Sequence, residues 1–309
     1  RSTEATEAEE AGGTLGEIMS EIFNEVDGGK PIDKTLTGIP IVDECTNGLA
    51  KGELVTIGAK SGKGKSALAV RIAVNMFRDG KKVLIVSREM SKKQIGERIL
   101  LAHSGVTKEN YEKRTLSETD WVRIVETTEA FNTDQIIIDD KIATIPEIKQ
   151  AVRKHKPDML IVDYVQLLTP TNPRDSRERQ VADMSRELKK MTSDFDMIVV
   201  QLTQLAEKGI GNYRPHGESY PRESRAIYHD SNIVIYVHHV EEEKEIQIAY
   251  NSTAVKERMS LHQFEEMLKR FDDNDTRLME LIVDKNRSGT VGSKFYWFSG
   301  PEMAYYPIC

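Results

Sequence analysis

Residues 58–66 read Gly-Ala-Lys-Ser-Gly-Lys-Gly-Lys-Ser, and they are the most informative motif in the chain. It directly follows the apolar run at 53–57 and directly precedes a helix-forming run at 67–74. A strand, a glycine-rich turn and a helix in series form a phosphate site, because glycines let backbone N–H groups converge on the phosphates and the helix N-terminus adds positive potential. In such a loop Lys65 reaches the β- and γ-phosphates, and the Ser66 hydroxyl is placed to ligate Mg²⁺. We therefore expect the chain to bind and hydrolyse ATP with Mg²⁺.

The loop departs from the usual pattern at its opening position, which holds Ala59 rather than glycine. Lys60 and Lys63 make it unusually cationic, which favours tight phosphate binding or compensates for something missing elsewhere. A chance turn rich in glycine and lysine is the alternative, and the flanking strand and helix argue against it. The predicted nucleotide-binding residues are Ala59, Ser61, Gly62, Lys63, Gly64, Lys65 and Ser66.

The length and charge of the chain fit one large α/β domain. It has 309 residues, of which 39% are apolar and 30% are charged, so one large core or two modest ones can form, and we favour one. The 43 Lys and Arg residues against 50 Asp and Glu residues give a net charge of −7. This balance argues against a globally basic nucleic-acid-binding protein but is compatible with a local basic channel.

The cysteines and the hydropathy pattern indicate the compartment. Cys45 and Cys309 form no C-x-x-C pair, so the sequence contains neither a disulfide framework nor a zinc motif. It also contains no signal peptide and no long apolar segment. We expect a cytoplasmic protein, in the host cytoplasm if the source is a phage.

The N-terminal residues differ in character from the rest of the chain. Residues 1–13 are rich in Glu, Ala, Thr and Gly, which predicts a disordered linker. Within residues 14–30, apolar side chains recur at helical spacing on one face: Leu15, Ile18, Met19, Ile22, Phe23 and Val26. That face packs either on its own domain or on a neighbouring subunit, and the pattern alone does not decide between the two.

Four further apolar runs alternate with helical segments. The apolar runs lie at 82–87, 135–139, 159–163 and 197–201. Segments with a helix-forming pattern lie at 91–103, 145–155 and 180–192. Continuous apolar runs are typical of parallel strands buried on both faces, so the chain is expected to form a doubly wound, mostly parallel twisted sheet with helices on both faces. Ligands of such sheets bind at the carboxyl ends of the strands.

Two carboxylates follow strands of this sheet and are candidates for catalysis. Asp163 ends an apolar strand, a position from which a carboxylate can hold Mg²⁺ beside Ser66. The next residue is Tyr164 rather than Glu, so the base that activates water must come from elsewhere in the chain. Glu89 follows the strand at 82–87 and is our candidate; the alternative is that it merely occupies the first turn of the next helix.

Other polar residues near strand ends have weaker assignments. Gln204 follows the strand at 197–201 and is suited to sensing the γ-phosphate or orienting the attacking water, although a solvent-facing glutamine is equally compatible with the pattern. Asp139 and Asp140 are assigned to loop or helix-cap roles, because more carboxylates near the phosphates would repel them.

The order of the motifs resembles the C-terminal motor domain of DnaB-type replicative helicases, from about residue 15 to near the C-terminus. The motifs that carry the resemblance lie at 37–49, 59–66, 87–91, 161–167, 201–205, 222–224 and 285–289. The resemblance implies a RecA-like motor over residues 31–309 that works in a hexameric ring around single-stranded DNA, unwinds duplex, and binds ATP between subunits. It also implies that the segment at 14–30 is a linker helix docked on the adjacent subunit, with a primase or helicase loader as a further partner.

The same resemblance implies roles for individual residues. Glu89 would be the catalytic base, Asp163 the Walker B carboxylate and Gln204 the γ-phosphate sensor. Lys285 and Arg287 match the K-x-R pair that completes the ATP site of the next subunit in trans. A cation from a neighbour stabilises charge on the transferring phosphoryl group. The alternative is that the pair belongs to a solvated basic turn that precedes a strand at 294–298.

Two polar loops that leave strand ends occupy the places of the channel loops in this family. Their cations can neutralise DNA phosphates without reading bases. A solvated loop is the alternative. The predicted DNA-binding residues are Arg174, Arg177, Arg179, Lys208 and Arg214.

Some features depart from the family pattern. Residues 241–278 form a longer charged stretch than expected, with an amphipathic helix at 261–271, and this stretch is either a surface insertion or a partner site. His238 and His239 are not accompanied by the carboxylate and cysteine ligands of a metal site, and we interpret them as the end of a strand. The competing function is a recombinase-like or regulatory RecA-type ATPase that assembles on nucleotide without unwinding.

Overall fold

The computed structural model describes residues 13–29, 33–205, 214–217, 222–272 and 276–308, and the chain divides into two units at Asp33 and Lys34. The first unit contains helix α1 (Leu15–Asp27), which begins at Thr14 with a capping box to Glu17. The predicted helix is confirmed. None of its residues is buried in this chain, so its apolar face, which is 43% to 74% exposed, has no cover within the first unit.

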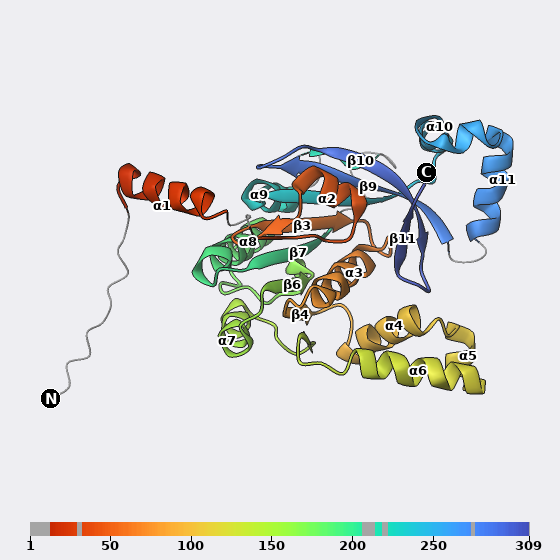
Figure 1. Ribbon diagram of the computed structural model, residues 1–309, viewed down its shortest axis with the longest axis horizontal. Coiled ribbons are helices and arrows are strands. Elements are labelled where there is room, and N and C mark those ends of the chain that lie inside the picture. The colour runs from red at the N-terminus through yellow and green to blue at the C-terminus, as the bar shows by residue number, and fades with distance from the viewer. Residues whose placement is uncertain (1–12, 30–32, 206–213, 218–221, 273–275, 309) are drawn as a thin grey trace. The chain divides into compact units, whose positions relative to one another are not determined.

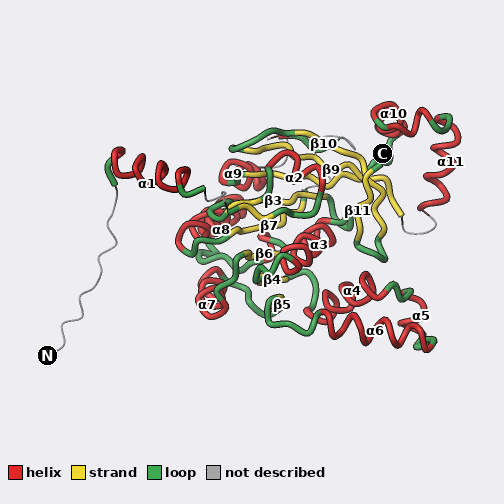
Figure 2. Tube along the Cα trace, viewed as in Figure 1, coloured by secondary structure: helices red, strands yellow, loops and turns green. Residues whose placement is uncertain are grey.

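The second unit is built on one large sheet (Figures 1 and 2), with strand order β11-β10-β9-β8-β3-β7-β6-β4-β5 among the described residues. The strands from β8 to β5 are parallel to one another and confirm the predicted fold class. Their bounds are β3 Leu54–Ala59, β4 Val83–Ser87, β5 Ile136–Asp139, β6 Met159–Asp163, β7 Ile198–Gln204 and β8 Ile233–His239.

An antiparallel extension, of which the sequence predicted only the strand at 294–298, completes the sheet on the β8 side. It consists of β9 (Thr276–Asn286), β10 (Gly292–Ser299) and β11 (Ala304–Pro307). A separate two-stranded sheet pairs β1 (Lys34–Thr35) with β2 (Leu49–Ala50).

Helices cover both faces of the sheet (Figure 1). Alternate strand residues enter two different cores, since Val83 and Ile85 lie in one cluster and Leu84 and Val86 in the other. The period of two along a strand sends successive side chains to opposite faces. The helix bounds are α2 Pro40–Thr46, α3 Lys65–Arg78, α4 Lys92–Ser104, α5 Lys108–Lys113, α6 Glu118–Ala130, α7 Ile145–His155, α8 Arg177–Asp194 and α9 Arg222–Asp230. No helix of the described part of the chain is both long and apolar enough to cross a membrane.

The charged stretch at 241–278 forms a small helical layer over its described residues up to Asp272, and Thr276 to Leu278 begin strand β9. It contains α10 (Glu243–Ser252), a short 3-10 turn (Ala254–Glu257) and α11 (Leu261–Asp272), which confirms the predicted amphipathic helix. The layer is anchored by fully buried Phe264, whose ring lies 5.8 Å from that of Trp297 on β10. Aromatic packing therefore fixes this layer to the antiparallel extension.

Candidate nucleotide site

The phosphate loop forms between β3 and α3, as predicted. Helix α3 begins at Lys65 with Gly64 as its N-cap, and both Gly62 (φ 69°) and Gly64 (φ 91°) have left-handed backbone conformations. A Cβ atom added to Gly64 would lie 2.8 Å from the Tyr305 hydroxyl, which donates a hydrogen bond to the Gly64 carbonyl at 3.2 Å. Glycine is thus required at position 64 both by the backbone and by the close approach of β11.

Lys65 lies at the centre of a charged cluster. Its side chain is buried, its Nζ atom forms an ion pair with Glu89, and the same atom lies 3.9 Å from Asp163 Oδ1. It also lies 4.7 Å from the centroid of the Tyr164 ring. Strands β4 and β6 are neighbours, with Ser87 paired to Asp163, so the carboxyl ends of both strands deliver their acids to one lysine.

Asp163 has the environment expected of a cation ligand. Its carboxyl group is buried, and this burial raises its pKa, while a hydrogen bond from Ser66 and the charge of Lys65 oppose the rise. Within the described residues, its Oδ1 atom accepts no hydrogen bond. A buried, unsatisfied carboxylate oxygen beside the hydroxyl of Ser66 fits a hard divalent cation such as Mg²⁺.

Gln204 is the last residue of β7 and pairs in register with Ala59, where the phosphate loop begins. Our sequence reasoning assigned no role to Gln166, which follows β6 in a short 3-10 turn (Val165–Leu167). The Nε2 atom of Gln166 donates to Thr203 Oγ1 at 2.7 Å and to the Gln204 carbonyl at 3.4 Å. Gln166 therefore links the end of the Asp163 strand to the end of the Gln204 strand. The sequence signal that could have identified Gln166 was its position within the motif at 161–167, which also contains Asp163.

The prediction that Asp139 and Asp140 act as loop and cap residues is confirmed. Asp139 Oδ1 accepts hydrogen bonds from the backbone of Lys141 and Ile142 at 2.8 and 3.0 Å. Asp140 Oδ2 accepts one from Lys92 N at 2.9 Å, at the start of α4, and this bond lowers the pKa of Asp140. Neither carboxylate is in the Lys65 cluster.

Lys285 and Arg287 lie at the opposite edge of the sheet from the phosphate loop of the same chain. Lys285 Nζ donates to the carbonyls of Tyr228 and His229 at 2.6 and 3.1 Å, and Arg287 Nη2 donates to that of His229 at 2.7 Å. Asn286 pairs with Ile233, which in turn pairs with Val55 at the start of β3. The pair is therefore separated from the loop by the length of β3, about 15 Å at 3.3 Å per residue.

The predicted DNA-binding arginines have different surroundings. Arg174, Arg177 and Arg179 are exposed, and Arg177 donates to the Gln166 carbonyl. Arg214 forms a two-bond ion pair with buried Glu280, with both distances 2.7 Å. Lys208 lies outside the described residues.

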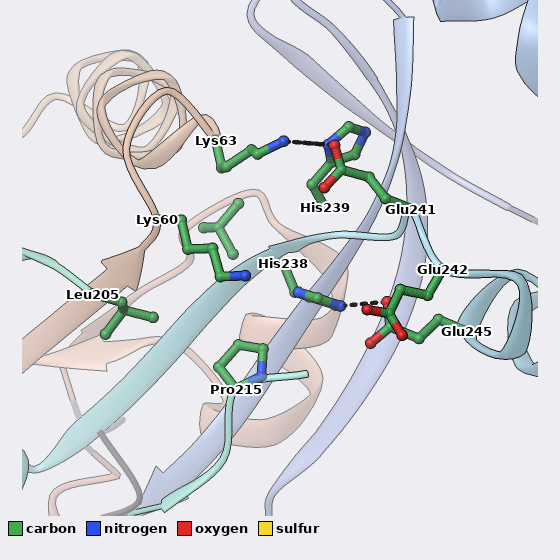
Figure 3. A pocket seen from close by; sticks show the side chains of 10 residues that line it. Lys60, Lys63, Leu205, Pro215, His238, His239, Glu241, Glu242 and Glu245 are labelled. Atoms are coloured by element: carbon green, nitrogen blue, oxygen red, sulfur yellow. Dashed lines mark hydrogen bonds and ion pairs between the residues drawn. The ribbon is translucent and has the colours of Figure 1, made fainter. Parts of the chain in front are cut away.

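A cavity adjoins the phosphate loop on the β8 side (Figure 3). It is lined from the loop by Lys60 and Lys63, and from the end of β8 by His238 and His239. The interpretation of both histidines as the end of a strand is confirmed, since β8 ends at His239. The acidic residues that complete the lining belong to the 241–278 layer: Glu241, Glu242 and Glu245.

A parallel sheet with a glycine-rich phosphate loop after β3, and an acid after a nearby strand, defines a P-loop NTPase with a RecA-like core. The chain belongs to the family of the DnaB-like helicase C terminal domain, whose family model matches residues 35–305. The predicted resemblance is thereby confirmed.

Individual relatives agree with this assignment. The chain is 30% identical over 241 residues to the replicative DNA helicase DnaB of Leifsonia xyli, covering 72% of this chain and 51% of the relative. It is 30% identical over 274 residues to a probable plasmid replicative DNA helicase of Chlamydia psittaci, covering 85% of this chain and 53% of the relative. The chain thus spans about half the length of these curated relatives.

Solved structures share the fold. The ATPase domain of G40P superposes with a TM-score of 0.77 at 24% identity, over 96% of this chain and 100% of that one. A DnaB-like replicative helicase described with its interactions with primase superposes with a TM-score of 0.73 at 23% identity, over 96% of this chain and 67% of that one.

Proposed function

We propose that this chain is the motor of a ring-forming, ATP-dependent DNA helicase that translocates on single-stranded DNA. One observation carries the proposal: Lys65, Glu89 and Asp163 converge at the phosphate loop in a chain of the DnaB-like family. The names of the relatives, which are replicative helicases, support the choice of DNA unwinding over other uses of ATP.

The residues of one chain provide most of the chemistry. The loop N–H groups and Lys65 bind the β- and γ-phosphates, and Ser66 with Asp163 holds Mg²⁺. When bound, Mg²⁺ neutralises charge on the phosphate oxygens. The phosphates compete with Glu89 for Lys65, so nucleotide binding releases the Glu89 carboxylate, which then accepts a proton from the attacking water. Gln204 orients that water or senses the γ-phosphate.

Lys285 and Arg287 act on the nucleotide of a neighbouring copy. Their position at the opposite edge of the sheet supports this assignment, because they cannot reach the loop of their own chain. A cation supplied across an interface makes hydrolysis depend on the arrangement of subunits. The exposed apolar face of α1 (Leu15–Asp27) is proposed to dock on an adjacent copy and close the ring.

DNA contacts are assigned to the polar loops at strand ends. Arg174, Arg177 and Arg179 are exposed and can neutralise phosphates, and Lys208 is retained from the sequence prediction. Arg214 would have to leave Glu280 to reach DNA, so we expect it to contribute less than the other four. A primase or a helicase loader is the proposed protein partner, and the cytoplasm the proposed location.

An unwinding assay tests the proposal. The chain, with Lys65→Ala as the inactive control, is given a forked DNA duplex with ATP and Mg²⁺. Strand separation by the wild type and none by the variant supports the helicase motor. Hydrolysis of ATP that does not respond to single-stranded DNA and separates no strands would favour the regulatory RecA-type ATPase instead.

A further inference from the structure

Lys63 is anchored on the side of the phosphate loop that faces away from the catalytic acids. Its Nζ atom lies 2.7 Å from His239 Nδ1 and 2.8 Å from Glu241 Oε1 (Figure 3). In the sheet, β3 separates β8, which carries His239, from β6, which carries Asp163, and from β4, after which Glu89 follows. Lys65 and Lys63 are only two residues apart, yet they pair with acids on opposite sides of β3.

The backbone around Lys63 needs an external restraint. Lys63 stands between Gly62 and Gly64, both with left-handed φ angles, and a single backbone bond from Lys63 N to the Lys60 carbonyl at 3.3 Å closes the turn. Glycines lose more conformational freedom on ordering than other residues, so a loop of this composition is costly to hold in one conformation. A side-chain anchor between the two glycines reduces the freedom that nucleotide binding must remove.

The anchor comes from the layer at 241–278. Glu241 is its first residue, and Glu245 of α10 pairs with buried His238 Nε2 at 2.9 Å, next to His239. Arg277, at the start of strand β9, donates from Nη1 to the Gly62 carbonyl at 3.5 Å. Glu241 before the helices and Arg277 on β9 after them therefore contact the same turn of the phosphate loop.

We propose that Lys63 is a positioning residue of the ATP site, and that Glu241 and His239 clamp it so that the phosphate loop is preorganised for nucleotide. The inference rests on the proposed function, since it concerns the same site. It gives the 241–278 layer a role as a structural support of that site.

The direction in which Glu241→Gln changes nucleotide affinity distinguishes this clamp from a simple electrostatic effect. Removing a carboxylate near an anionic nucleotide should tighten binding by Coulomb's law. If Glu241 clamps Lys63, Glu241→Gln should instead weaken nucleotide binding, because the released Lys63 no longer restrains the turn. Glu242→Gln is the matched control, since Glu242 lines the same cavity and has no bond to Lys63.

The test is an equilibrium titration of the intact chain with a fluorescent ATP analogue and Mg²⁺, with KM and kcat measured in parallel. Lys63→Met and Glu241→Gln should each weaken binding about five-fold, which corresponds to about 1 kcal/mol. The double variant should bind no more weakly than either single one. Lys63→Arg should restore most of the affinity, and kcat at saturating ATP should change less than two-fold in Glu241→Gln.

Three results would overturn the clamp. Tighter binding by Glu241→Gln with weaker binding by Lys63→Met would make Lys63 a direct phosphate ligand. Equal effects of Glu241→Gln and Glu242→Gln would reduce the interaction to through-space charge. Unchanged affinity in every variant would remove any role for Lys63. If the wild type itself bound no nucleotide, the proposed function would fail first, which distinguishes the two failures.

Discussion

At the scale of single residues, the site depends on charges that hold one another in place. The buried Lys65 side chain balances the negative charges of Glu89 and Asp163. Of these two acids, Glu89 is partly exposed to water. A buried lysine without a partner carries a large desolvation cost, so the acids stabilise it until phosphate arrives. The same pairing holds Glu89 at the position from which it can act as a base.

Replacing Glu89 by glutamine is expected to lower the rate of ATP hydrolysis by at least about 100-fold, the usual contribution of a general base. Nucleotide affinity should be kept or increased, because the phosphates no longer compete with a carboxylate for Lys65. Single-turnover hydrolysis and equilibrium binding measure the two effects. Glu126→Gln, an exposed position on α6, is the control. A hydrolysis rate within a few-fold of the wild type would exclude Glu89 as the base.

Gly64 and Gly96 form a contrasting pair of glycine positions. Gly64→Ala should abolish nucleotide binding, because its φ of 91° is strained for alanine and the new methyl group meets Tyr305 Oη at 2.8 Å. Gly96→Ala should raise stability by up to about 1 kcal/mol, since Gly96 lies within α4 and a Cβ there has open space. Thermal unfolding and nucleotide titration of both variants check the contrast. Equal behaviour of the two would contradict it.

At the scale of elements, α4 contains a titratable group that is partly buried next to Phe131, the residue that follows α6. The imidazole of His103 lies 5.0 Å from the Phe131 ring, with Nδ1 2.8 Å from the Ile99 carbonyl. Burial lowers its pKa below the ordinary value of 6.5, and Arg78 and Arg71 add to this effect. The protonated ring is therefore disfavoured in the folded chain.

The pH dependence of stability follows from this shift. Below about pH 6.5 the unfolded chain binds a proton at His103 that the folded chain resists, so the free energy of unfolding falls as the pH drops from there through the lowered pKa. His103→Gln should flatten the change in unfolding midpoint between pH 7 and pH 5. Parallel thermal melts of wild type and variant measure it. Identical pH profiles would show that His103 does not titrate in this window.

The elements differ in how far the sequence predicts them. Strands such as β4 and β6 are continuous apolar runs because both faces are buried, and their positions follow from composition alone. Strand β10 has mostly partly buried residues, and its Phe295 and Trp297 pack in a cluster with Phe264 of α11, a contact that the local sequence pattern does not indicate. For that reason only part of the antiparallel extension was predicted, as the strand at 294–298.

The site shows the same division. The phosphate loop and Asp163 are local patterns, and the sequence identifies them. The pairs Arg214–Glu280 and Lys63–Glu241 join residues 66 and 178 positions apart, and a single sequence contains no signal for such contacts. Sequence reasoning therefore named Lys65, Glu89 and Asp163, which the fold brings together, whereas the contacts that support the loop required the fold.

At the scale of the whole molecule, the second unit carries the two proposed halves of an ATP site at opposite edges of one sheet. The phosphate loop follows the carboxyl end of β3, while Lys285 and Arg287 lie level with its start. Two copies arranged head to tail would bring the halves together, and repetition of that contact closes a ring when the rotation allows it. The central claim is that ATP is hydrolysed between subunits.

The most direct test mixes two inactive variants of the chain. Lys65→Ala lacks the phosphate lysine, and Arg287→Ala lacks the cation supplied to the neighbour, which is worth about 1,000-fold or more in related chemistry. Steady-state ATP hydrolysis is measured for each variant alone and for their mixture, over a series of protein concentrations with single-stranded DNA. We predict that the mixture regains activity that neither variant has alone, and that wild-type activity rises more than linearly with concentration. Hydrolysis that is linear in concentration and survives Arg287→Ala would contradict a site shared between subunits.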